Sequence, residues 1–219
     1  LPELKKRARG NPHKTKGTLR IPKDFKVPSY HTAADIHLQP GGYHATPDGG
    51  DSIAAGALYD RSVYLYAIGG MGNMNDDLGK TTIGFYEESF SGEKPLRVLD
   101  MGCSVGHSTL AWAQAYPNTE VHGLDCGEGM VRYAHARARN LGINAHFSQQ
   151  NAEKTDFPDN YFDIVTSYIV NHEVPDEFNK QIIAEAYRVT RPGGYFYPLD
   201  FKTRGSKGDA YSMYRRWWD

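Results

Sequence analysis

The chain is poor in cysteine, has no long apolar run and carries almost no net charge. Its 219 residues include two cysteines, and the formal net charge at pH 7 is −1. So few cysteines argue against the disulfide frameworks of small secreted proteins. No apolar run approaches the roughly 18 residues that span a bilayer, and the N-terminus has no signal-peptide core. We expect a cytoplasmic globular protein without a membrane span, large enough to bury one substantial core.

The small net charge hides an uneven distribution. Residues 1–26 carry nine Lys or Arg against two acids, residues 27–201 carry 11 against 22, and residues 202–219 carry five against two. A basic tail could bind RNA phosphates, but solvated tails of this kind are commoner and the body of the chain is acidic. The charge pattern therefore disfavours a nucleic-acid partner and leaves the role of the tail open.

The most informative stretch is RVLDMGCSVG at residues 97–106. Val98 and Leu99 are typical of a buried parallel strand, which passes at once into a turn of small residues beginning at Gly102. Small side chains allow the backbone to approach a ligand where a Cβ atom would clash. Asp100 ends the strand at the edge where open α/β sheets bind their ligands. The stretch predicts a nucleotide-type cofactor site, although such a turn alone is a weak signal.

The sequence downstream supports this interpretation. Residues 120–125 (EVHGLD) predict a second strand that ends in Asp125, about 20 residues after the turn, where an acid can bind two ribose hydroxyls. Further strands are predicted within residues 144–153, at residues 162–170 and after residues 192–194, where Pro-Gly-Gly is expected to end a helix. Two more helices are expected before residue 95, at residues 52–68, with Ser52 as its cap, and at residues 81–90.

These pieces, in this order, resemble the class I S-adenosylmethionine-dependent methyltransferases over roughly residues 95 to 201. The family's acid-x-Gly-x-Gly-x-Gly turn stands here as Asp100, Gly102, Ser104 and Gly106, with serine for the middle glycine. Hydride-transferring Rossmann enzymes carry Gly-x-Gly-x-x-Gly instead. The resemblance implies an α/β fold, a Rossmann-like doubly wound sheet with an N-terminal helical lid, and the small-molecule branch typified by ubiquinone and menaquinone methyltransferases.

The resemblance also implies S-adenosylmethionine as the cofactor, with S-adenosylhomocysteine as its product. The family's ribose acid falls on Asp125 and its adenine-contacting pair on Asn151 and Ala152. The full set of cofactor-binding residues that it implies is Asp100, Gly102, Cys103, Ser104, Gly106, Asp125, Cys126, Met130, Asn151, Ala152, Glu153 and Ser167.

Methyl transfer from a sulfonium is an in-line displacement that depends mainly on positioning and on the exclusion of water, so few catalytic side chains are required. A general base is still useful for an oxygen acceptor, and His172, at the tip of the fourth strand, is the first candidate. His37 and His44 in the lid region follow. With His31 and Asp35 they form the one cluster of metal-like composition, but the segment is loop-like and we expect no metal.

The expected organisation is a basic tail (1–26), a substrate-recognition or lid region (27–95) and a cofactor-binding domain (96–219). The family usually adds two strands after the fifth, so the chain is either truncated or its sheet is closed by something else, and we expect truncation.

The predicted function is methyl transfer to an oxygen, nitrogen or carbon atom of a small molecule. An RNA methyltransferase and a cofactor-binding protein that does not methylate are the alternatives; the oligomeric state is open, with a homodimer as one option.

Overall fold

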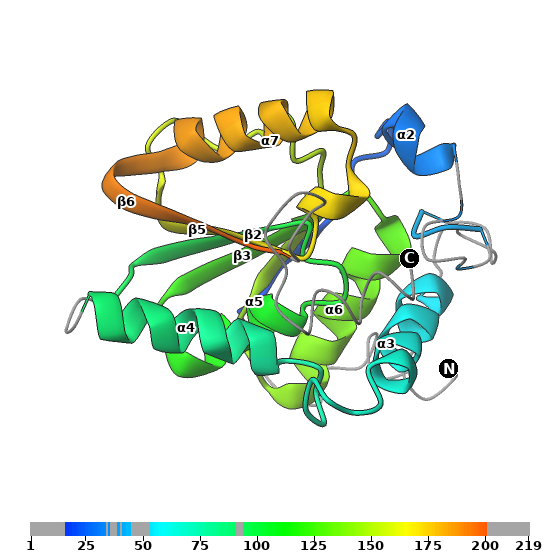
Figure 1. Ribbon diagram of the computed structural model, residues 1–219, viewed down its shortest axis with the longest axis horizontal. Coiled ribbons are helices and arrows are strands. Elements are labelled where there is room, and N and C mark those ends of the chain that lie inside the picture. Colours follow the sequence, from blue (N-terminus) through cyan, green and yellow to red (C-terminus); the bar gives the residue numbers. More distant parts are fainter. Residues whose placement is uncertain are drawn as a thin grey trace, which may run out of the picture.

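The computed structural model describes residues 16–33, 35, 39, 41–44, 53–90 and 94–200. These residues form one six-stranded sheet in the order β1-β4-β3-β2-β5-β6, and every neighbouring pair is parallel (Figure 1). The fold class predicted from the sequence is confirmed. The strands are β1 (Leu19–Arg20), β2 (Arg97–Met101), β3 (Glu120–Asp125), β4 (His146–Gln149), β5 (Phe162–Tyr168) and β6 (Thr190–Leu199).

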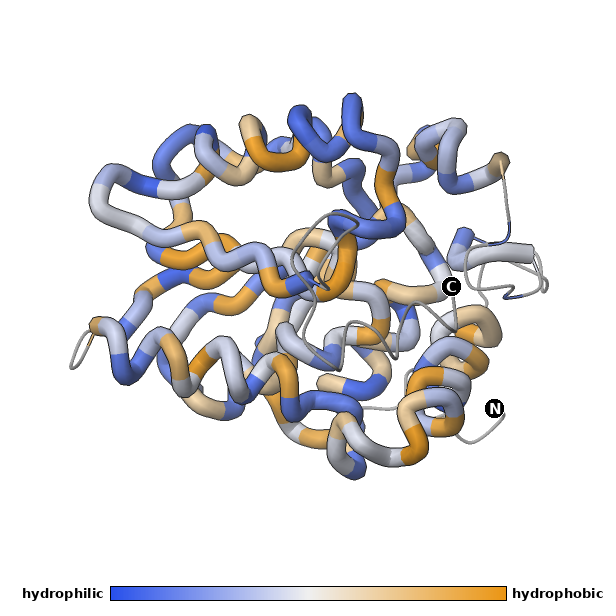
Figure 2. The backbone as a smooth tube through the Cα atoms, in the orientation of Figure 1, coloured by the Kyte–Doolittle hydropathy of each residue, from blue (hydrophilic) through white to orange (hydrophobic). Residues whose placement is uncertain are grey.

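Helices cover both faces of the sheet. In Figure 1, α7 lies on one face and α4, α5 and α6 lie on the other. Trp112 of α5 and Ile182 of α7 are buried in the separate apolar clusters on these two faces. Figure 2 shows hydrophobic segments in the central strands between them. The helices are α2 (Ser29–Thr32), α3 (Ala54–Tyr66), α4 (Asp77–Ser89), α5 (His107–Ala115), α6 (Glu128–Leu141) and α7 (Asp176–Val189), with a short 3-10 helix at Asn171–Glu173.

Strand β2 is the centre of this arrangement. Asp100 pairs with Gly123 of β3 on one side and with Thr166 of β5 on the other. Val98 and Leu99 have no exposed surface. Because all three strands run in the same direction, their carboxyl ends meet at one edge of the sheet, where ligands bind in open α/β folds.

Strand β1 comes from the region expected to be a tail. Leu19 and Arg20 pair with Phe147 and Ser148 of β4, and the guanidinium of Arg20 forms an ion pair with the carboxylate of Asp156. Two residues are too few to give the alternating pattern by which a strand is predicted from sequence. Among the described residues, no helix is long and apolar enough to cross a membrane.

The Pro-Gly-Gly at residues 192–194 lies inside β6, so the predictions that it ends a helix and that the strand begins after it are wrong. Helix α7 ends at Val189 and β6 begins at Thr190, and the register against β5 shifts between Phe162 and Ile164. Gly193 has a φ of 75° there. Proline and glycine are tolerated at such an irregularity because it interrupts regular pairing.

The two N-terminal helices have slightly different bounds from those expected. Helix α3 begins at Ala54, with Ile53 rather than Ser52 in the N-cap position. Ser52 itself lies outside the described residues. Helix α4 begins at Asp77, one turn before the predicted start.

Helix α3 packs very closely on α6 through Gly56. A Cβ atom at this position would lie 2.4 Å from Cβ of Tyr133 and 2.8 Å from the carbonyl oxygen of Gly129. Gly84 of α4 lies in open space by contrast, because a Cβ atom there would have no atom within 4 Å.

We predict that Gly56→Ala lowers the free energy of unfolding by about 1–3 kcal/mol, because the added methyl group forces the two helices apart. The matched change Gly84→Ala should raise it by roughly 0.5–1 kcal/mol, because glycine in a helix interior is less favourable than alanine. Urea unfolding measures both. A Gly56→Ala protein as stable as the parent would contradict this packing.

Candidate cofactor site

A hollow lies at the carboxyl ends of the central strands. The empty space that it encloses, together with the open solvent at its mouth, is about 750 Å³. Its wall combines the loops after β2, β3, β4 and β5 with side chains from the N-terminal region. The predicted cofactor-binding residues that line it are Gly102, Cys103, Ser104, Asp125, Cys126, Met130, Asn151 and Ala152.

Four predicted cofactor-binding residues are not among those lining the hollow. Asp100 is buried beneath the turn, where its Oδ2 accepts a hydrogen bond of 2.6 Å from the Thr109 hydroxyl. Gly106 precedes α5 with a φ of 79°. Glu153 accepts a hydrogen bond from Tyr30, and Ser167 donates one to Asn171 Oδ1 at 3.0 Å.

The turn after β2 needs small residues for a measurable reason. Gly102 has a φ of 73°, and a Cβ atom there would lie 2.5 Å from Cγ2 of Val170. Ser104, the serine that replaces the family's middle glycine, also has a positive φ, of 48°. This left-handed backbone is uncommon for any residue other than glycine. Ser104 therefore adopts a backbone conformation that glycine adopts more readily.

Asp125 joins this turn to the loop after β3. Its Oδ2 accepts the backbone N–H of Ser104 at 2.9 Å, and its Oδ1 accepts the N–H of Gly127 at 2.8 Å. Burial raises the pKa of this carboxyl, while the two backbone donors act in the opposite direction. The arrangement holds one acid at the wall of the hollow, between the loops that follow β2 and β3.

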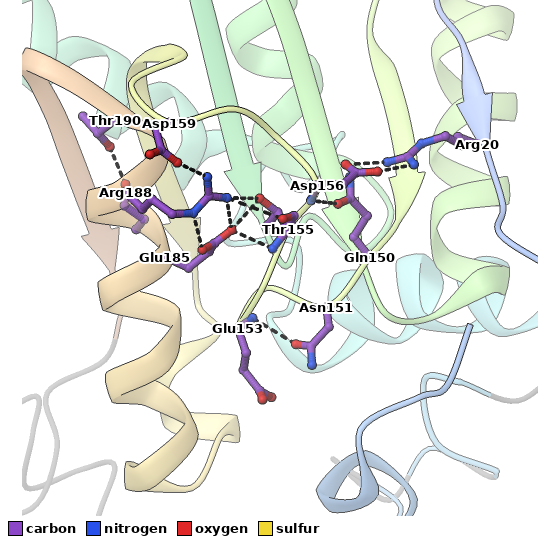
Figure 3. A network of polar contacts seen from close by, with 11 residues as sticks. Arg20, Gln150, Asn151, Glu153, Thr155, Asp156, Asp159, Glu185, Arg188 and Thr190 are labelled. Atoms are coloured by element: carbon purple, nitrogen blue, oxygen red, sulfur yellow. Dashed lines mark hydrogen bonds and ion pairs between the residues drawn. The ribbon is translucent and has the colours of Figure 1, made fainter. Parts of the chain in front are cut away.

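The loop after β4, which carries Asn151 and Ala152, is fixed by the polar network in Figure 3. Glu185 of α7 accepts both the backbone N–H and the hydroxyl of Thr155, each at 2.6 Å, and pairs with Arg188. Burial raises the pKa of Glu185, but these partners outweigh it and the pKa is lowered. The loop therefore has little freedom at the point where it enters the hollow.

Aromatic residues from the N-terminal region complete the wall. Tyr43 and Tyr59 meet edge to face with ring centroids 5.1 Å apart, and the Tyr59 ring stacks on His107 at 6.1 Å. The Tyr43 hydroxyl also donates to Oε1 of Glu173 at 3.3 Å. The abundance of tyrosine in this region was visible in the sequence, but nothing distinguished those that face the hollow. The lining residues missed by sequence reasoning are Tyr30, His31, Tyr43, Tyr59, His107, Leu124, Gln150, Tyr168, Ile169, Val170, Glu173, Val174 and Ile182.

Asp60 anchors α3 to the cofactor-binding domain. Its Oδ1 lies 2.7 Å from Nε2 of His107, and its Oδ2 accepts the Tyr133 hydroxyl at 2.8 Å. Burial opposes ionisation, but the hydrogen bond with His107 and the charge of Arg137 outweigh it and lower the pKa of Asp60 to about 2. The adjacent residue Tyr59 is thereby held against the start of α5.

Neither of the two described histidines that were proposed as bases lines the hollow. His172 is not among its lining residues, and its Nδ1 lies 2.8 Å from Oδ1 of Asp200. His44 is likewise not a lining residue, and His37 lies outside the described residues. The neighbouring Glu173 does line the hollow. The catalytic role of these histidines stays a prediction.

Neither metal ligation nor disulfide formation has support among the described residues. No group of three or more His, Cys, Asp or Glu there is arranged to hold a metal ion. Cys103 and Cys126 are both free and buried, and burial raises the pKa of each thiol.

Comparisons with known proteins agree with this geometry. A family model described as a methyltransferase domain matches residues 98–194. The ubiquinone/menaquinone biosynthesis C-methyltransferase UbiE of Psychromonas ingrahamii is 34% identical over 113 residues, covering 50% of this chain and 44% of that protein. The demethylmenaquinone methyltransferase of Geobacillus kaustophilus is 39% identical over 105 residues, covering 47% and 44%. This chain thus matches less than half the length of these two relatives.

Among solved structures, the PH0226 protein of Pyrococcus horikoshii aligns with a TM-score of 0.57 at 24% identity, covering 73% of this chain and 66% of that one. This likeness shows the fold alone. The fold, the turn after β2 and the family match together identify residues 98–194 as a class I methyltransferase domain of the S-adenosylmethionine-dependent type. Within that class, the domain is similar to the proteins named as a ubiquinone/menaquinone biosynthesis C-methyltransferase and a demethylmenaquinone methyltransferase.

The buried carboxyl of Asp100 makes the stability of the folded protein depend on pH. Burial raises the pKa of its carboxyl to about 7, although the Thr109 hydrogen bond opposes the shift. Its other oxygen, Oδ1, is buried and has no hydrogen-bond partner among the described residues. The folded protein thus retains a proton that the unfolded chain has released above about pH 4.

We predict that the ligand-free protein loses stability as the pH rises from about 4 to about 7, by on the order of a few kcal/mol, because ionising Asp100 is costly only in the folded state. Asp100→Asn should remove this component of the slope. The free energy of urea unfolding at several pH values for both proteins measures it. Two parallel pH profiles would contradict the assignment.

Proposed function

We propose that this chain transfers the methyl group of S-adenosylmethionine to a small-molecule acceptor. The observation that carries the proposal is the position of Asp125. This carboxylate ends β3, accepts a backbone N–H from the turn after β2 and lines the same hollow as Asn151. A carboxylate at this place in a doubly wound fold is suited to two ribose hydroxyls.

The residues present fit this cofactor. Gly102 allows the turn at the wall of the hollow to pack directly against Val170, since a Cβ atom there would clash with that side chain. Asn151 and Ala152, the pair to which the resemblance assigns the adenine contact, line the same hollow. The aromatic rings of Tyr43 and Tyr59 at the wall of the hollow offer favourable surroundings for a sulfonium cation. When bound, the cofactor supplies an electrophilic methyl group. We propose no resident metal.

The chain itself then has to hold two reactants in line and exclude water. Tyr59 is held in place through Asp60, and Tyr43 through its hydrogen bond to Glu173. Tyr43, Tyr59 and Tyr168 form an aromatic wall that suits a medium-sized aromatic acceptor. The similarity to C-methyltransferases favours a carbon atom as the acceptor.

No observation favours the two alternative functions. Arg20, one of the basic residues of the predicted tail, forms an ion pair with Asp156 within the fold. The similar proteins are named as enzymes of small-molecule biosynthesis, which supports neither an RNA substrate nor a protein without methylation activity. A cytoplasmic location and a homodimer stay predictions.

Calorimetric titration with S-adenosylmethionine, S-adenosylhomocysteine and NAD tests the proposal. We expect micromolar binding of the two sulfur compounds and none of NAD. Asp125→Ala should weaken their binding by about 1.5–3 kcal/mol, because charge-assisted hydrogen bonds are lost. Asp24→Ala, which removes an exposed carboxylate that does not line the hollow, serves as the control. Binding of NAD, or unchanged affinity in Asp125→Ala, would contradict the proposal.

A further inference from the structure

His31 is a residue of the hollow to which the predicted cofactor site gives no role. It lies on α2 and lines the hollow beside the wall that carries Asp125. Its Nδ1 atom is buried and has no hydrogen-bond partner among the described residues. A buried polar atom left unpaired costs roughly 1–3 kcal/mol. Such atoms are rare, and one on a residue that lines a ligand site is explained most simply by a partner on the ligand.

Helix α2 is pinned in place by the residue before His31. The hydroxyl of Tyr30 donates a hydrogen bond of 2.7 Å to Oε1 of Glu153, and its ring packs against Phe178 with centroids 4.6 Å apart. Burial and the Glu153 carboxylate both raise the pKa of Tyr30, so the phenol remains a donor. Because α2 has only four residues, this contact fixes where the neighbouring His31 lies.

The hydroxyl of Tyr30 contacts the loop after β4, which forms the adenine end of the proposed site. Glu153 directly follows Asn151 and Ala152, and its backbone N–H donates to Oδ1 of Asn151 at 2.9 Å, as Figure 3 shows. Helix α2 is thus attached to the loop after β4. His31 interacts electrostatically with Asp125 and with Glu173. It therefore lies among the acids at the carboxyl ends of the strands, on the ribose side of the proposed cofactor.

A ribose hydroxyl can form hydrogen bonds with the Asp125 carboxylate and the His31 imidazole at the same time. A hydroxyl that donates its proton to the Asp125 carboxylate still has lone pairs that accept a hydrogen bond. The carboxylate has no proton to offer, and its two oxygens already accept N–H groups of Ser104 and Gly127. The imidazole of His31, with its hydrogen on Nδ1, supplies the missing N–H donor. The ribose hydroxyl in turn gives Nδ1 the hydrogen-bond partner that it lacks.

We propose that His31 donates a hydrogen bond to a ribose hydroxyl of bound S-adenosylmethionine, with Asp125 accepting from the same diol. Helix α2, attached through Tyr30 and Glu153, is then a second cofactor-binding element from outside the Rossmann-like domain. The inference rests on the proposed function, because it requires S-adenosylmethionine or its product in the hollow.

The test measures binding of S-adenosylhomocysteine and of its 2′-deoxy and 3′-deoxy analogues by calorimetry, in the full chain and in His31→Ala. We expect His31→Ala to weaken binding of S-adenosylhomocysteine about 5- to 20-fold, as for loss of one buried hydrogen bond. For the analogue that lacks the contacted hydroxyl, the two proteins should differ by less than about twofold. This coupling separates a direct contact from a general loosening of α2.

The matched control is His135→Ala. His135 lies on α6 and also has a buried ring nitrogen, Nε2, without a hydrogen-bond partner among the described residues, but it does not line the hollow. Its replacement should leave all three affinities unchanged, and melting temperatures show whether each variant is folded.

Two failures remain distinguishable. If the parent chain binds no S-adenosylhomocysteine, the proposed function fails and this inference fails with it. If the parent binds but folded His31→Ala binds equally well, or loses the same factor for all three ligands, the role of His31 alone is overturned.

Discussion

The parallel pairing of β2 with both of its neighbours is the constraint on which the rest of the structure depends. It aligns Asp100, Gly123 and Thr166 in one row and brings the ends of β2, β3 and β5 to the same edge. Only in that arrangement can the carboxylate of Asp125 reach the backbone N–H of Ser104 in the adjacent loop. The hollow lies at this edge because the loops that follow the parallel strands all begin there.

The N-terminal region uses two different attachments to cover that edge. Asp60 fixes α3 through His107 and Tyr133, so one wall is bound to the start of α5 and to α6. Tyr30 fixes α2 to the loop after β4 through Glu153. Both contacts are hydrogen bonds between an acid and a partner far away in the sequence. They position aromatic side chains and an imidazole over a site whose floor is made by the sheet.

The sequence predicts the floor of the site well because its signals are local. The turn at Gly102, the strand ending in Asp125 and the spacing between them lie within one continuous stretch, and the structure brings them together. The walls have no such signal. Tyr59 and His107 meet across 48 residues of sequence, and nothing in the pattern near either one indicates the other.

Other differences have equally physical causes. Pro192 was expected to precede the strand, but an irregularity in the pairing with β5 accommodates it inside β6. His172 was placed correctly just after β5, yet the position of a residue along the chain does not tell where its side chain points. Its Nδ1 contacts Asp200, which ends the described residues.

The central claim, that the hollow binds S-adenosylmethionine with its ribose on Asp125, is tested most directly by a crystal structure of the chain with S-adenosylhomocysteine. The account predicts both ribose hydroxyls within hydrogen-bond distance of the Asp125 carboxylate, with the adenine beside Asn151 and Ala152. A ligand bound elsewhere, or one whose ribose faces away from Asp125, would contradict it.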